Sequence, residues 1–191
     1  MKVLLVILFF ILPSFALTND TRVFQKIQKD FDSIIVKDLN NKKLIFSKDE
    51  NQILRPASLT KIMTAMLAIE SGKMNSIVTI TPEMKKVEPT VANFKVGEKF
   101  YLKDLVHAAM IKSANDAANS IAIYLGNGNK QKFVSMMNLK AKKLGMKNTN
   151  FTNPCGFDIG NHSSTANDLL KLTEYAIKNK TFNSIVKLEK Y

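Results

Sequence analysis

A buried helix is the feature that most constrains how this chain folds. From Pro56 onward the sequence is apolar on nearly every side of a helix, and Gly72 marks its end. A helix that is apolar all round has to be enclosed by other elements, so the chain should form one domain with a substantial core. The only charge between Arg55 and Glu70 in this stretch is Lys61.

Lys61 is a candidate general base because apolar surroundings favour the neutral amine. A base near neutrality needs a pKa roughly three units below the unperturbed lysine value, about 4 kcal/mol of differential stabilisation. Ser58 lies one turn earlier on the same helical face, so the lysine could take its proton and activate it as a nucleophile. Backbone N–H groups at the helix start would also face a developing oxyanion. The competing interpretation is a lysine that extends its ammonium group to solvent at the helix edge.

A second polar element, Ser113-Ala-Asn115, interrupts two apolar helical stretches, where unpaired polar groups are costly. A functional interpretation has Ser113 relaying a proton to the leaving group while Asn115 holds a substrate amide and contacts the base. The alternative is a turn between helices with a capping side chain. The Ser-x-x-Lys spacing recurs at Ser184 and Lys187, and we take that copy as chance because no buried helix start surrounds it.

The remaining pattern predicts a mainly helical α/β fold. Alternation and turn residues predict a β-hairpin, and that hairpin needs further strands that the sequence does not clearly supply. This favours an incomplete chain, a helical subdomain plus an N-terminal hairpin of an antiparallel sheet whose later strands are missing. The expected segments are strands at 32–37, 43–47, 77–80 and 94–100, and helices at 56–70, 102–125 (interrupted at 113–116), 130–144 and 164–179.

The first sixteen residues predict a signal peptide. Lys2 is followed by an apolar run over 3–12 and by a small-x-small cleavage site at Ser14 to Ala16. A retained N-terminal anchor is the alternative. The expected mature domain is 17–191, exported to the periplasm or cell envelope.

Charge and composition limit the kinds of partner that this chain can have. A net charge of +12 favours anionic partners, and with an export signal these are acidic cell-wall polymer or anionic lipid headgroups at a peripheral membrane contact, rather than nucleic acid. Simple solvated lysines are the alternative. The single Cys155 excludes an intramolecular disulfide and is interpreted as a bystander. His107 and His162 lack the spacing of metal ligands, so we expect no metal or cofactor, and His107 should be packed or hydrogen-bonded.

Taken together, these motifs resemble the serine D-alanyl-D-alanine carboxypeptidases, the low-molecular-weight penicillin-binding proteins, which have a β-lactamase/transpeptidase-like fold. The two motif serines, Ser58 and Ser113, are 55 residues apart. The resemblance runs from about Ile34 to the end of the chain. It rests on residues 55–65, 110–119, 137–146, 148–154 and 162–168.

The resemblance implies a mechanism for these residues. Ser58 would attack the carbonyl between the terminal D-alanines of a peptidoglycan stem peptide, and Lys61 would accept its proton. Ser113 would serve the leaving group, Asn115 would bind substrate, and water would hydrolyse the acyl-enzyme. β-Lactam antibiotics would acylate the same serine, whose backbone N–H would form half of the oxyanion hole.

One element of the resemblance is not matched. A Lys-Thr/Ser-Gly strand is expected roughly a hundred residues beyond Ser113, past Tyr191, and Lys180-Thr-Phe182 lacks the glycine. This leaves open an inactive periplasmic penicillin-binding-like fragment or binding module. A β-lactamase is a second alternative, although neither Glu83, Glu88 nor Glu98 begins the Glu-x-x-x-Asn pattern that such enzymes use for deacylation.

Overall fold

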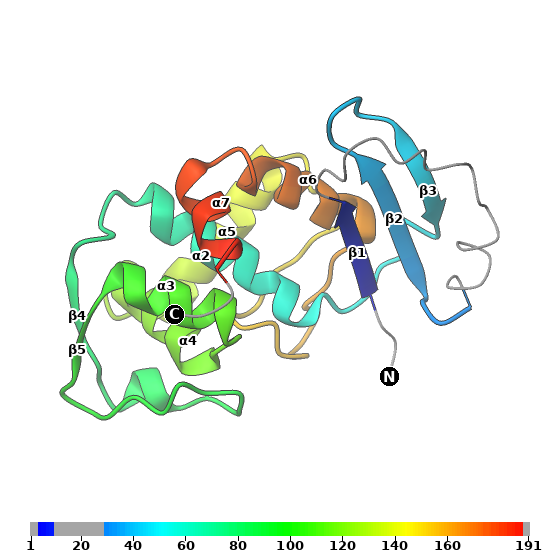
Figure 1. Ribbon diagram of the computed structural model, residues 1–191. Coiled ribbons are helices and arrows are strands. Elements are labelled where there is room, and N and C mark those ends of the chain that lie inside the picture. Colours follow the sequence, from blue (N-terminus) through cyan, green and yellow to red (C-terminus); the bar gives the residue numbers. More distant parts are fainter. Residues whose placement is uncertain (1–3, 10–28, 189–191) are drawn as a thin grey trace.

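The computed structural model describes residues 4–9 and 29–188. Figure 1 shows a small sheet at one end of the molecule and a body of helices at the other. The sheet has the strand order β1-β2-β3, made of β1 (Leu4–Phe9), β2 (Ser33–Asp38) and β3 (Leu44–Lys48). β1 runs parallel to β2, and β2 runs antiparallel to β3.

The predicted N-terminal hairpin is confirmed. β2 and β3 pair from Ile34↔Lys48 to Lys37↔Leu44, and the backbone N–H of Asp38 donates to the Lys43 carbonyl across the turn. The Asp38 carboxylate accepts the Asn40 N–H, the local bond that makes Asp a frequent turn residue.

No strand was predicted at 4–9, yet this segment forms β1 along the other edge of β2. A strand and a signal-peptide core are both apolar runs, so the sequence pattern does not distinguish them. The predicted cleavage site at 14–16 lies outside the described residues, and the signal peptide remains a prediction.

The predicted central helix is confirmed as α2 (Thr60–Glu70), preceded by the short 3₁₀ turn η1 (Ala57–Leu59). The side chains of Met63, Ala65, Met66 and Ala68 are fully buried in the main core. Ser58 therefore belongs to the 3₁₀ turn rather than to the α-helix itself.

The predicted strand at 77–80 and the interrupted helix are found, whereas the strand predicted at 94–100 is present only from Lys99. β4 (Ile77–Thr79) pairs antiparallel with β5 (Lys99–Tyr101), with the turn η2 (Glu83–Lys85) between them. Next come α3 (Leu102–Ile111) and α4 (Asn115–Leu125), separated by the predicted polar break.

Three further helices complete the body: α5 (Lys130–Lys143), α6 (Ala166–Ala176) and α7 (Lys180–Val186). The Thr165 and Asn129 side chains cap α6 and α5. α7 was not predicted; it contains both Lys180-Thr-Phe182 and Ser184, and it packs Phe182 and Ile185 into the core. Within the described helices, none has the length and apolar character needed to cross a membrane.

The sheet joins the helical body through α6, which packs against β1 and β2 (Figure 1). The buried contact is a small apolar cluster of Ile35, Ala166 and Leu170. The main core is separate and is built from α2 to α7, so the segments that carry the predicted motifs lie on the helical side of the molecule.

Candidate active site

Three predicted site residues meet at the start of α2. Ser58 is exposed, and its Oγ lies 3.2 Å from Nζ of Lys61 and 3.0 Å from Oγ of Ser113. The first contact joins neighbouring turns of one segment, whereas the second joins segments 55 residues apart. An exposed hydroxyl that is hydrogen-bonded to both an amine and a second hydroxyl has the geometry of an activated nucleophile.

Lys61 is only 2% exposed, although its partner serine is open to solvent. Burial lowers the pKa of its ammonium group, and the electrostatic influence of Cys155 partly opposes this. Nζ also donates to the Cys155 carbonyl at 2.9 Å, which fixes the amine next to Ser58. The predicted direction of the pKa shift is therefore found, and its physical cause is desolvation.

Ser113 lies in the tight break between α3 and α4 with φ of +53°, a backbone conformation that non-glycine residues rarely adopt. This break turns its hydroxyl toward Ser58. The strained conformation is held from both sides, since the Ala114 N–H donates to the Ala108 carbonyl and the Asn115 N–H to the Thr90 carbonyl.

Asn115 lies at the first position of α4 and is 6% exposed. Its Nδ2 donates to the Glu88 carbonyl at 2.9 Å. Among the described residues, no hydrogen bond joins the Asn115 side chain to Lys61. Asp116, its neighbour, accepts the N–H groups of Ala92 and Asn93. The first turn of α4 thus holds the segment 88–93 beside the site, and the role of Asn115 in binding substrate stays a prediction.

The loop 153–157 organises the other side of the site. Oδ1 of Asn153 accepts three successive backbone N–H groups, those of Cys155 (3.1 Å), Gly156 (2.8 Å) and Phe157 (3.0 Å). The Thr64 hydroxyl donates to the Pro154 carbonyl at 2.7 Å, which ties the loop to α2. One buried asparagine thereby sets the position of the Cys155 carbonyl that holds Lys61.

Gly156 lies against the backbone of Ala57 and Ser58. It has φ of +97°, and a Cβ added there would be 1.8 Å from the Ala57 carbonyl oxygen. Ala57 itself has φ of +47°, so two left-handed residues pack closely at this point. Only glycine allows this approach, which fixes the turn that presents Ser58.

His162 contacts the first residue of α2, Thr60. Its ring is fully buried, its Nδ1 accepts the Thr152 N–H at 3.0 Å, and its Nε2 lies 2.8 Å from the Thr60 hydroxyl. Because Nδ1 accepts a hydrogen bond, the proton of the neutral ring lies on Nε2, and this N–H donates to the Thr60 hydroxyl. Burial, aided by the charge of Arg55, lowers the pKa of His162 to about 4, so the ring is neutral at neutral pH.

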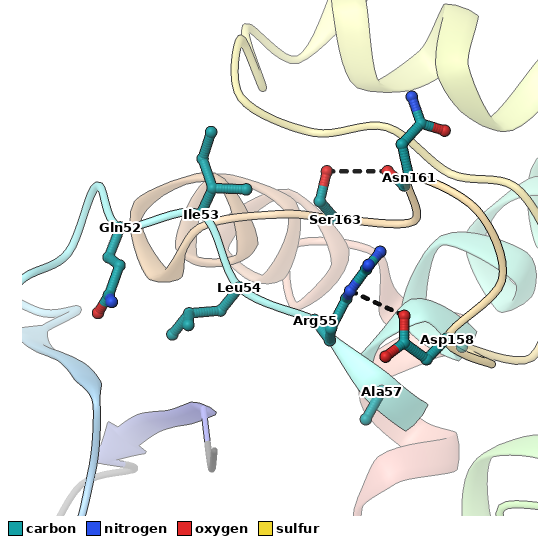
Figure 2. A pocket seen from close by; sticks show the side chains of 9 residues that line it. Gln52, Ile53, Leu54, Arg55, Ala57, Asp158, Asn161 and Ser163 are labelled. Carbon is teal, nitrogen blue, oxygen red and sulfur yellow. Dashed lines mark hydrogen bonds and ion pairs between the residues drawn. The ribbon is translucent and has the colours of Figure 1, made fainter. Parts of the chain in front are cut away.

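A hollow of about 740 Å³ opens beside Ala57 and Gly156. Figure 2 shows Arg55 beside Asp158 among the residues that line it, and the two form an ion pair of 2.8 Å. Arg55 also donates to the Gly160 and His162 carbonyls. This arginine therefore fastens the loop 158–162 to the segment that precedes Ser58.

The other candidate groups have structural partners. The Cys155 thiol is buried, and burial raises its pKa to about 11, which makes it a poor nucleophile near neutrality. Its carbonyl, however, accepts a hydrogen bond from the Lys61 amine, so this residue is more than a bystander. Nδ1 of His107 lies 2.6 Å from the Lys103 carbonyl, and the predicted hydrogen-bonded state is confirmed. Within residues 4–9 and 29–188, no group of three His, Cys, Asp or Glu residues is placed to hold a metal ion.

Sequence reasoning missed the residues that position the site. Asn153, Gly156 and His162 stand in segments that the motifs flagged only as family-like, and nothing in their local pattern shows what they contact. The sequence offered one signal, the Asn-Pro-Cys-Gly run at 153–156. Asn, Pro and Gly are turn-forming residues, so this run predicts a turn with a defined backbone conformation.

Comparison with known proteins gives a consistent result. The family model described as D-alanyl-D-alanine carboxypeptidase matches residues 20–190. D-alanyl-D-alanine carboxypeptidase DacF of Bacillus subtilis is 31% identical over 92% of this chain, and a D-alanyl-D-alanine endopeptidase of Escherichia coli is 38% identical over 73%. Each match covers 45% of the relative, so the chain spans about half the length of the curated relatives it matches.

Solved structures share the fold. A D-alanyl-D-alanine carboxypeptidase from Mycobacterium tuberculosis aligns with a TM-score of 0.75 at 31% identity, over 81% of this chain and 58% of that one. Penicillin-binding protein D2 of Listeria monocytogenes, solved in its ampicillin-bound form, aligns with a TM-score of 0.67 at 26% identity, over 77% of this chain and 61% of that one. The predicted β-lactamase/transpeptidase-like fold class is thereby confirmed.

Proposed function

Because the chain belongs to the D-alanyl-D-alanine carboxypeptidase family, we propose that its site carries out the acyl-transfer chemistry of a serine D-alanyl-D-alanine carboxypeptidase. The observation that carries the proposal is the exposed Ser58 hydroxyl, contacted at once by the buried Lys61 amine and by Ser113. The substrate class is peptidoglycan stem peptides that end in D-Ala-D-Ala, and β-lactams are the corresponding acylating inhibitors.

The acylation step follows the observed contacts. Neutral Lys61 accepts the Ser58 proton along the 3.2 Å line as Oγ attacks the carbonyl between the two D-alanines. The carbon–nitrogen bond then breaks, and a proton returns through Lys61 and Ser113 to the departing amine. D-Alanine leaves, and the rest of the peptide remains as an ester on Ser58.

Deacylation reverses the same proton path. A water attacks the ester carbonyl, gives its proton to the Lys61 and Ser113 pair, and releases the shortened peptide while Ser58 regains its proton. The pKa of Lys61, lowered by burial, suits a group that both accepts and returns a proton. Asn115 is the candidate for binding the substrate amide, at the start of α4 beside Ser113.

We also propose that residues 17–191 form the catalytic domain of a secreted protein, with 1–16 as its signal peptide. The family match over 20–190 supports the domain, and the substrate supports a location in the periplasm or cell envelope. The high positive charge suits contact with acidic cell-wall polymer or anionic lipid there.

The test is release of D-alanine from a synthetic peptide that ends in D-Ala-D-Ala. We expect release by the protein and none by Ser58→Ala. Ser184→Ala is the matched control, because Ser184 has the same spacing to a lysine but bonds to the Thr181 carbonyl in α7. Equal release by Ser58→Ala and the unmodified protein would overturn the proposal, as would absence of release from a folded sample.

A further inference from the structure

The small sheet made of β4 and β5 carries apolar side chains on both of its faces. Successive side chains along a strand point to opposite faces, so a strand at the protein surface normally alternates apolar and polar residues. On the inner face, Val78 is 1% exposed, and the ring centres of Phe100 and the buried Phe94 lie 4.6 Å apart. On the outer face, however, Ile77 and Tyr101 are 57% and 46% exposed. The outer face therefore lacks the polar character that a solvent-facing strand normally has.

The two exposed apolar residues form one patch. Ile77 is directly opposite Tyr101 in the antiparallel register, and Thr79 is directly opposite Lys99. Opposite residues of an antiparallel pair have their side chains next to each other on the same face of the sheet. We call these four residues, Ile77, Thr79, Lys99 and Tyr101, the β4–β5 face. Figure 1 shows β4 and β5 at the edge of the helical body, on the side away from the three-stranded sheet.

Lysines surround the apolar pair. Besides Lys99, the exposed Lys95 precedes β5 and the exposed Lys73 precedes β4. Nζ of Lys103 lies 5.0 Å from the centre of the Tyr101 ring, which brings a fourth positive charge to this place. Within the part of the chain that the structure describes, none of these four lysines forms an ion pair with an acidic side chain.

The acidic residues nearby are turned to the backbone. Oε2 of Glu98 accepts the N–H of Lys95 at 2.8 Å, and Oδ2 of Asp104 accepts the N–H of Tyr101 at 3.1 Å. Both carboxylates belong to half-buried residues, whereas Lys95 and Lys99 are exposed. The charge that this surface presents is therefore positive, and it favours an anionic partner.

We propose that the β4–β5 face rests on the surface of an anionic lipid bilayer, with Ile77 and Tyr101 in the headgroup region and the surrounding lysines on lipid phosphates. Tyrosine suits this position because its ring is apolar and its hydroxyl is polar. Lysine suits it because the long side chain packs against apolar groups while the ammonium group reaches charged ones. The inference goes beyond the proposed function, because it requires neither Ser58 nor a peptide substrate.

Two other occupants fit this face less well. A second copy of the chain would bring lysines against lysines, and like charges across an interface are unfavourable. A specific protein partner needs an interface of about 800 Å² on each side, which is more than the four residues of this face provide. A lipid surface needs no such area, since each lysine adds its own attraction to the anionic headgroups.

Fluorescence tests whether the β4–β5 face enters the bilayer. The chain contains no tryptophan, so one introduced tryptophan reports on its own position. Tyr101→Trp places it on the β4–β5 face. Leu44→Trp is the matched control, because Leu44 is 50% exposed and follows Lys42 and Lys43, but lies in the sheet at the other end of the molecule (Figure 1).

Each protein is mixed with vesicles made of phosphatidylglycerol and phosphatidylcholine in equal parts. We expect the emission of Tyr101→Trp to shift to shorter wavelength and that of Leu44→Trp to stay unchanged. Vesicles of phosphatidylcholine alone lack the negative charge, and soluble polyphosphate lacks an apolar phase, so neither should cause the shift.

Two double variants separate the β4–β5 face from the overall charge of the protein. Lys95→Gln/Lys99→Gln should weaken co-sedimentation with the mixed vesicles on the order of 25-fold, about fivefold for each lysine. Lys42→Gln/Lys43→Gln removes the same charge from the turn between β2 and β3. Because those lysines are far from the contact and screened by salt, this control should weaken binding less than about twofold.

Several outcomes would overturn the inference: equal losses for the two double variants, equal binding to both kinds of vesicle, or a shift for Leu44→Trp without one for Tyr101→Trp. A Tyr101→Trp shift as large with polyphosphate as with vesicles would also overturn it and assign the face to a soluble polyanion. Acylation of Ser58 by penicillin should be the same in both double variants, so the fate of the proposed function is read separately.

Discussion

The helical body and the three-stranded sheet differ in the interactions that stabilise each of them. In the helical body, Ser58, Lys61 and Ser113 are surrounded by buried polar groups with fixed partners, over a core that extends from α2 to α7. The sheet adds one small apolar cluster around Ile35 and one half-buried ion pair, Lys37 with Glu174 at 2.6 Å. Among the described residues, the contacts that position Ser58 therefore come from the helices and their loops, while those of β1–β3 join the sheet to α6.

Buried polar side chains lie mainly in the helical body, and among the described residues of the sheet only Ser33 is one of them. Thr60, Thr64, Asn153 and His162 are each 6% exposed or less. Thr60 and His162 bond to each other and Thr64 bonds to the Pro154 carbonyl, whereas Asn153 bonds to backbone N–H groups of its own loop. Such bonds add little net stability, but a lost partner leaves a costly buried group. Changes in this network should therefore affect both folding and acylation, and changes in the sheet should affect folding alone.

The largest expected effect on acylation comes from Lys61. Lys61→Met removes the base and should slow acylation of Ser58 by penicillin about 10³-fold, the usual range for a general base. Lys187→Met is the matched control and should leave the rate unchanged. Equal rates for the two variants would show that Lys61 is not the base.

The same residue sets the pH dependence. Because the pKa of Lys61 is lowered by burial, the neutral amine forms below pH 10.5. The acylation rate should therefore rise as pH increases, with the midpoint of the rise below pH 10.5. A midpoint at or above pH 10.5 would contradict a desolvated base.

Gly156 should have the next largest effect. Gly156→Ala places a methyl group where the Ala57 carbonyl lies and should displace the Ser58 turn. A displacement of that order slows acylation about 10²-fold. Gly128→Ala is the control, since it has a similar φ of +83° but nothing within 4 Å of the added methyl. If both variants are acylated at the same rate, the close approach does not position the nucleophile.

His162 should affect stability more than acylation. The pKa of His162 is about 4 in the folded protein and 6.5 when unperturbed, so the unfolded chain binds more protons between these values. The free energy of unfolding should thus fall as pH drops from 6.5, with a contribution of about 3 kcal/mol lost by pH 4.

His162→Gln replaces the ring N–H with an amide N–H donor, and the glutamine side chain does not titrate. Urea unfolding at pH 7 and pH 4 should show a smaller loss for this variant than for the unmodified protein. Identical losses would mean that the ring is not buried in its neutral form.

The smallest effect on acylation is expected from the sheet. Ile35→Val removes one methylene from the contact with α6 and should lower the free energy of unfolding by about 1 kcal/mol. The acylation rate of the folded variant should not change. A variant that folds but is acylated several-fold more slowly would show that the sheet does shape the site.

The two regions also differed in how well the sequence predicted them. The helices and the contact of Ser58 with Lys61 follow from local spacing, and the meeting with Ser113 was inferred from two motifs read together. The packing of Gly156 against Ala57 and the contact of His162 with Thr60 join segments about a hundred residues apart, and no local pattern specifies such contacts. β1 was missed because an apolar run alone does not specify its partner, and α7 because its short apolar pattern follows directly after α6.

The central claim is that the helical body holds a reactive serine at position 58. The most direct measurement is the intact mass of the folded protein before and after incubation with penicillin, with Ser58→Ala as the control. The account predicts a gain of one penicillin mass, located on Ser58 by peptide mapping and absent from the control. No gain in a folded sample, or an equal gain in the control, would contradict it.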